Sequence, residues 1–203
     1  MPFIHSPLSA CLVLIALWGF IGLAGLLRPT SLLFVGRTLF PLGALCGLAL
    51  AVVAATSLAT PSEQMVLRVG LPDLPMHVRR DALTSLFLLL LGAASAGISV
   101  FAAGYFRRGH GTPPGLMCLQ YHLFLASMGF VLLADDAYAF MVAWETMALS
   151  SYFLVTTQHA IPEIRRAGSI CWESQTGGGV WCCSLSGSSA RSTVWCLPRS
   201  RPT

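Results

Sequence analysis

Charged residues are scarce in this sequence. Only 10% of its 203 residues are Asp, Glu, Lys or Arg, against about a quarter in soluble globular proteins. Hydrophobic residues make up 55% of the chain, and they gather in runs of about 20 residues, the length that a helix needs to cross a hydrocarbon core about 30 Å thick. The composition excludes an ordinary soluble domain and predicts an all-α, polytopic transmembrane helix bundle.

Lysine is absent, so every one of the 12 basic residues is Arg. Their small excess over acidic residues lies in the connections between apolar runs, where Arg can set membrane orientation and face anionic headgroups. They form no basic stripe with interleaved aromatic residues, and the chain has no glycine loop of the kind that cradles phosphates. Nucleic-acid and nucleotide binding are therefore excluded, and the lipid bilayer is the expected environment.

Paired cysteine motifs are also missing. Cys11, Cys46 and Cys118 stand singly in apolar runs, where Cys behaves as a small hydrophobic residue. Four more cysteines lie near the C-terminus without C-x-x-C spacing or a His among them: Cys171, Cys182, Cys183 and Cys196. Their spacing does not favour zinc, and the sequence predicts no disulfide framework.

Five membrane spans are predicted, each bounded by Pro, Arg or Asp. They cover about residues 8–27, 38–60, 82–104, 116–134 and 137–157. The first run has no basic residue ahead of it and is longer than a signal-peptide core, so we expect it to remain as a membrane helix. Asp135-Asp136 leaves room only for a tight helical hairpin and can cap the helix that follows. Residues 1–166 are expected to form one transmembrane domain.

Arg residues flank the connections unequally, which predicts an orientation. The first and third connections and the end of the fifth span each carry two: Arg28 and Arg37, Arg107 and Arg108, and Arg165 and Arg166. The fourth connection has only Asp135 and Asp136, although the second also carries Arg68, Arg79 and Arg80. Because Arg is retained on the cytoplasmic side, we expect the N-terminus outside and residue 160 onward inside.

The segment 167–203 has a different character. It is rich in Ser, Gly, Cys and Trp, follows no helical or alternating period, and contains no apolar run long enough to span a membrane. We interpret it as an irregular, out-of-frame tail produced by a frameshift, and we expect the parent protein to continue with more membrane helices. Resequencing the gene across codons 160–175 tests this interpretation, because an intact frame would contradict it.

Glu145 is the one charged residue well inside a predicted span. An ionisable side chain at mid-membrane costs about 2.5–3.5 kcal/mol on insertion scales, so such residues usually face a protein interior or water and mark an ion path. A carboxyl whose burial and nearby cations oppose each other can take up and release protons. We interpret Glu145 as a proton-pathway residue; the alternative is a structural acid neutralised by an Arg or held by a neighbouring helix.

Three further side chains are candidates for the same pathway. Residues seven apart lie nearly in line on a helix, so Tyr138 and Tyr152 share a stripe with Glu145 and place hydroxyls on either side of it. His122 in the fourth span is a second candidate relay, since it can exchange protons near neutral pH; the alternative is that it only holds a neighbouring helix by a hydrogen bond. No nucleophile–base pair, metal-ligand cluster or redox-cofactor motif occurs in the spans, so we expect no catalytic, metal or cofactor site in this chain.

Residues 121–159, YHLFLASMGFVLLADDAYAFMVAWETMALSSYFLVTTQH, resemble the antiporter-like membrane subunits of respiratory complex I, multisubunit cation/proton antiporters and membrane-bound hydrogenases. Within that family the ASM and LSSYFLV segments are most similar to the hydrogenase-4 component B branch, which includes the formate hydrogenlyase membrane subunit. Two further landmarks, RRDALTSLF at 79–87 and SVFAAGYF at 99–106, occur in the same order and spacing. The likeness covers about residues 1–168.

The resemblance implies two inverted five-helix repeats and a proton path along the membrane midplane. It also implies that Glu145 pairs with a Lys on a later helix, which this lysine-free chain does not contain. The partners implied are other membrane and peripheral subunits, which hold iron–sulfur clusters and nickel or quinone, while this chain binds no cofactor itself. The implied location is the inner membrane of a bacterium.

The expected function is therefore the N-terminal part of a proton-translocating subunit in a complex of the hydrogenase-4 or NADH-quinone oxidoreductase type. Such a subunit is a non-catalytic part of an oxidoreductase. Two alternatives stay open at this point: a cation/proton antiporter subunit without a redox partner, and an inactive truncated membrane fragment.

Overall fold

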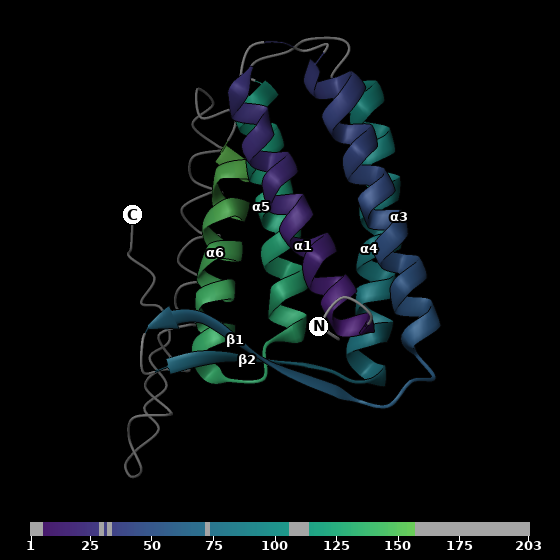
Figure 1. Ribbon diagram of the computed structural model, residues 1–203. Coiled ribbons are helices and arrows are strands. Elements are labelled where there is room, and N and C mark those ends of the chain that lie inside the picture. The colour runs from purple at the N-terminus through teal and green to yellow at the C-terminus, as the bar shows by residue number, and fades with distance from the viewer. Residues whose placement is uncertain (1–5, 29–30, 32–33, 72–73, 106–113, 157–203) are drawn as a thin grey trace, which may run out of the picture.

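The apolar runs form long helices that stand side by side in an up-and-down bundle (Figure 1). This computed structural model describes residues 6–28, 31, 34–71, 74–105 and 114–156. The helices are α1 (Pro7–Ala24), α3 (Phe40–Ser57), α4 (Ala82–Tyr105), α5 (Pro114–Leu133) and α6 (Ala137–Val155). Two short helical turns, η1 (Gly25–Leu27) and η2 (Val35–Leu39), end α1 and begin α3. The all-α class is confirmed.

Four of these helical segments are long and apolar enough to cross a membrane, at 20 to 23 residues each: Pro7–Leu27, Val35–Ser57, Ala82–Gly104 and Pro114–Leu133. They coincide with the first four predicted spans. The fifth predicted span coincides with α6, a helix of 19 residues, and its crossing of the membrane stays a prediction. The tail at 167–203 and the Arg pairs at 107–108 and 165–166 lie outside the described residues.

The closest approach in the bundle is between α3 and α4, where two glycines face each other. A Cβ atom on Gly92 would lie 2.6 Å from the carbonyl oxygen of Gly47, and one on Gly47 would lie 2.5 Å from Ser95 Oγ. Small residues promote helix association in lipid because they let backbones approach closely. At this glycine pair, the backbone of α3 is therefore in direct contact with the backbone of α4.

The second connection holds an element that the sequence analysis did not predict, an antiparallel hairpin of β1 (Glu63–Leu71) and β2 (Leu74–Arg80). It lies across the end of the bundle at which the described chain begins (Figure 1). The Leu8 N–H donates to the Glu63 carboxylate over 3.1 Å, and the Asp135 N–H donates to the His77 carbonyl over 3.0 Å. The hairpin thereby joins the start of α1 to the turn between α5 and α6.

That turn is as tight as the sequence predicted, and one of its two acids, Asp136, has the expected capping role. The Asp136 carboxylate accepts hydrogen bonds from the N–H of Ala139, in the first turn of α6, and from the N–H of His77, each over 2.6 Å. Desolvation opposes ionisation of this carboxyl, but these hydrogen bonds outweigh it, and the pKa of Asp136 lies below its usual value. Asp136 therefore fixes both the start of α6 and the position of the hairpin.

Arg80, at the end of β2, is fully buried although it belongs to a connection between spans. Its guanidinium donates to the carbonyls of Ser57 and Pro61, each over 3.0 Å, and to the hydroxyls of Thr60 and Ser85 over 2.9 and 3.2 Å. The Ser57 carbonyl lies at the C-terminus of α3, where the helix dipole favours a cation. Arg80 therefore closes the end of α3 and holds it to the start of α4.

Replacement of this cation is expected to loosen the hairpin. Arg80→Met should lower the free energy of unfolding by about 2–3 kcal/mol, because it leaves buried carbonyl and hydroxyl groups without their donor. The matched control is Arg79→Met, since Arg79 is the exposed neighbour on the same strand. Thermal unfolding of the purified variants in detergent measures the difference, and equal melting temperatures would contradict the structural role of Arg80.

Candidate functional site

Glu145 lies near the middle of α6, on the face that the described helices leave uncovered. The residues of α6 that are buried are all small, namely Ala139, Ala143, Ala148 and Ser150, and this face packs against α5. Glu145 is exposed, as is Val142, which lies about one helical turn before it. This acid was predicted to face a protein interior or water; among the described residues, no helix covers the side of α6 on which it lies.

Tyr138 and Tyr152 are both half-buried on α6. Seven residues of α-helix rise about 10.5 Å, and side chains on a helix tilt in the same direction, so each hydroxyl stays far beyond hydrogen-bond distance of the carboxyl. The ring of Tyr152 packs edge-on against Phe153, with centroids 5.5 Å apart. Proton movement along this stripe therefore needs water or side chains from other helices between the three groups.

His122, in the middle of α5, is fully buried. Its Nδ1 lies 2.9 Å from the Cys118 carbonyl, which assigns the ring proton to Nδ1 and leaves Nε2 as an acceptor. Nε2 has no hydrogen-bond partner within the described part of the chain. It faces the backbone of Gly43, where a Cβ atom could not be accommodated.

A second hydrogen-bonded group lies beside this histidine and links α5 to α4. The hydroxyl of Tyr121 lies 3.0 Å from Ser99 Oγ and donates to the Ser95 carbonyl over 3.3 Å. The ring of Tyr121 meets that of His122 edge-on, with centroids 5.2 Å apart. The sequence analysis missed Tyr121, Ser95 and Ser99; the available signal was the pair of serines four residues apart within an apolar run.

The structure separates the candidates into two groups. His122 faces α1 and α3, since both Gly22 and Gly43 approach its side chain, whereas Glu145 points away from the bundle on α6. No interaction joins the two among residues 114–156. The same described ranges contain no group of three or more His, Cys, Asp or Glu side chains that could hold a metal ion.

Comparison with known proteins adds a partial likeness. No protein-family model matches the chain. An uncharacterised protein of Mycobacterium tuberculosis, found in two strains, is 39% identical over 106 residues, which is 51% of this chain and 16% of the mycobacterial protein. Hydrogenase-4 component B of Escherichia coli is 32% identical over 80 residues, which is 39% of this chain and 12% of that protein. The chain is therefore a membrane protein that is similar, over part of its length, to a component of hydrogenase-4.

Proposed function

We propose that this chain is the N-terminal part of a proton-translocating, antiporter-like membrane subunit in a complex of the hydrogenase-4 or NADH-quinone oxidoreductase type. The observation that carries the proposal is Glu145, a carboxyl at the middle of α6 on an uncovered face. A charged side chain at mid-membrane costs about 2.5–3.5 kcal/mol unless protein or water surrounds it. The exposed position of Glu145 therefore requires a neighbouring helix or a hydrated path against α6.

The likeness to hydrogenase-4 component B supports the choice of complex. The complex would supply the neighbouring helix and the peripheral subunits. Iron–sulfur clusters, nickel or quinone belong to those partners in the proposal, and this chain supplies only groups that hold and pass protons. Glu145 is the group that takes up and releases the proton, and Tyr138 and Tyr152 orient water on either side of it.

Orientation in an inner membrane is part of the same proposal, with the N-terminus and the hairpin outside. Arg28 and Arg37, at the opposite end of the bundle, are both exposed. At the hairpin end Arg80 is buried and hydrogen-bonded, so it is not a free charge in the connection. Arg79 is exposed at the hairpin end, so among the described side chains two exposed Arg at one end compare with one at the other, and this difference supports the orientation given by the positive-inside rule.

Inverted membrane vesicles from the source bacterium test the proposed function. Deletion of the gene is expected to abolish proton uptake driven by an electron donor such as H2 or NADH, and a plasmid copy of the complete gene should restore it. Quenching of a pH-sensitive dye measures the uptake. Unchanged uptake would contradict the proposal, and uptake that requires a sodium gradient but no electron donor would identify an antiporter instead.

A further inference from the structure

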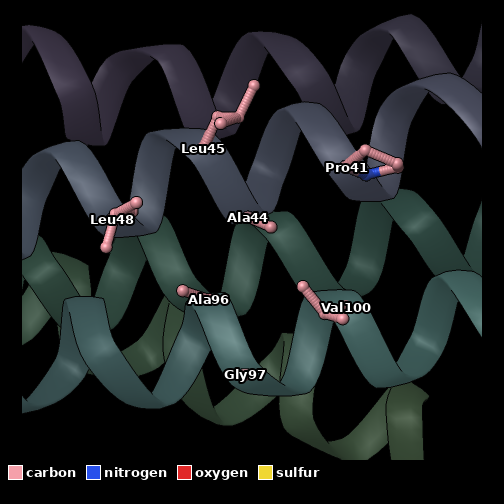
Figure 2. Close-up of a pocket in the computed structure, with 7 residues that line it drawn as sticks. All are labelled: Pro41, Ala44, Leu45, Leu48, Ala96, Gly97 and Val100. Atoms are coloured by element: carbon pink, nitrogen blue, oxygen red, sulfur yellow. The ribbon is translucent and has the colours of Figure 1, made fainter.

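An apolar groove runs along the outside of the bundle between α3 and α4 (Figure 2). Its volume is about 600 Å³. Residues from the first half of α3 and the second half of α4 line it: Pro41, Ala44, Leu45, Leu48, Ala96, Gly97 and Val100. None of these side chains is polar, so the groove offers contacts only to an apolar occupant.

The groove exists because the α4 side is built from small residues. A Cβ atom added to Gly97 would meet no heavy atom within 4 Å. The side chains at the edges, Leu45, Leu48 and Val100, are 63%, 55% and 65% exposed. The groove is therefore an open apolar surface on two helices that are long and apolar enough to cross a membrane, where a hydrocarbon chain can lie.

A cation lies beyond the Pro41 end of the groove. Arg37 is exposed and precedes Pro41 by four residues, which places it on the same face of the helix. Among the described residues it forms no ion pair. The acidic side chains of the described chain lie elsewhere, near the hairpin or on α6: Glu63, Asp81, Asp135, Asp136 and Glu145. Within the described part of the chain, therefore, no acidic side chain neutralises the charge of Arg37.

The dimensions match one lipid leaflet. From Phe40 to Leu48 α3 rises about 12 Å at about 1.5 Å per residue, and the helical turn η2 adds the further rise from Arg37 to Phe40. Half of a hydrocarbon core about 30 Å thick is about 15 Å. A lipid whose phosphate lies beside Arg37 would therefore place its acyl chain along the whole groove.

We propose that this groove binds one acyl chain of an anionic phospholipid whose phosphate pairs with Arg37. The apolar lining selects a hydrocarbon chain, and the exposed guanidinium of Arg37 selects a negative headgroup. A free phosphate ion would use Arg37 alone and leave the groove empty. If the N-terminus lies outside, the lipid belongs to the cytoplasmic leaflet, which carries the negative surface potential.

Native mass spectrometry of the purified 203-residue chain tests this site. The protein is exchanged into detergent with equal amounts of phosphatidylglycerol and phosphatidylcholine that carry the same acyl chains. We expect wild type to retain one phosphatidylglycerol in preference to phosphatidylcholine. Arg37→Gln should lower its retention about fivefold, which is the effect of one surface Arg on an anionic lipid.

Gly97→Leu should abolish retention of the lipid, because its side chain would occupy the groove, and a Cβ atom at this position meets no heavy atom within 4 Å. The matched control is Gly19→Leu on α1. A Cβ atom there also meets nothing within 4 Å, but all the residues that line the groove lie on α3 and α4. This control should retain the lipid as wild type does. Circular dichroism verifies that all the variants keep their helix content.

Four results would overturn the proposal. Equal retention of both lipids by wild type would show an unselective lipid shell, and wild-type retention by Gly97→Leu would place the lipid elsewhere. Competition by glycerol phosphate, which has a phosphate but no acyl chain, would show a plain anion site at Arg37. A wild-type dimer that Gly97→Leu dissociates would identify a second copy of the chain as the occupant.

Discussion

Glu145→Gln, introduced into the complete subunit to which we assign this chain, is expected to abolish redox-driven proton uptake while the complex still assembles. Glutamine keeps the size and the hydrogen-bonding groups of the side chain but cannot bind and release a proton. Because Glu145 is the only ionisable side chain on the described length of α6 apart from Tyr138 and Tyr152, no neighbouring carboxyl on that helix can replace it. Uptake should fall to the level seen with an uncoupler.

The controls separate proton transfer from assembly. Asp135→Asn removes an exposed acid in the turn before α6 and should leave uptake unchanged, since Asp135 contacts the hairpin through its backbone N–H. Glu145→Asp keeps a carboxyl and should restore part of the uptake. Native gel electrophoresis measures assembly, and electron transfer to an artificial acceptor measures the redox partners. Full uptake by an assembled Glu145→Gln complex would refute the proposed role.

Gly92→Leu is expected to prevent α3 and α4 from packing and to remove most of the folded protein. A Cβ atom at this position would lie 2.6 Å from the Gly47 carbonyl oxygen and 2.7 Å from the Ala51 nitrogen. Both neighbours are main-chain atoms of α3, so neither can rotate away. Overpacking a core usually costs about 1–3 kcal/mol, and a clash of helix backbones should reach at least the upper end of that range.

Gly104→Leu is the matched control on the same helix, because a Cβ atom there meets nothing within 4 Å. It should express and melt as wild type does. Size-exclusion chromatography measures the yield of monodisperse protein, and thermal unfolding in detergent measures the stability of what remains. A Gly92→Leu protein with wild-type yield and melting temperature would show that α3 and α4 are not held together at this glycine pair.

Much of the architecture follows from the length of the apolar runs. The first four helices lie at the predicted positions because a run of about 20 apolar residues bounded by Pro or Arg has few other structures available in a membrane. The hairpin was missed because its sequence contains Gly70, Pro72 and Pro75 and because its inward face ends in Arg80 rather than in an apolar residue. Buried Met76 and Val78 do alternate with exposed His77 and Arg79, but this alternation was too short to predict a strand.

The candidate site was also only partly predictable, because the sequence identifies the acid but not the direction in which it points. A single acid in an apolar run identifies Glu145, but a helix that is apolar on all sides does not reveal which face packs against its neighbours. The outward position of Glu145 therefore required the structure. The bond between Tyr121 and Ser99 required it too, since two residues on different helices show no common period in the sequence.

The hairpin has a consequence for the way this protein enters the membrane. Once β1 and β2 have paired, α3 and α4 are joined by a folded polar element that is too large and too polar to pass back through hydrocarbon. Withdrawal of either helix would first have to break the strand ladder and strip the Arg80 guanidinium of its hydrogen-bond acceptors. The folded hairpin therefore opposes withdrawal of this helix pair from the membrane and preserves the orientation in which the pair was inserted.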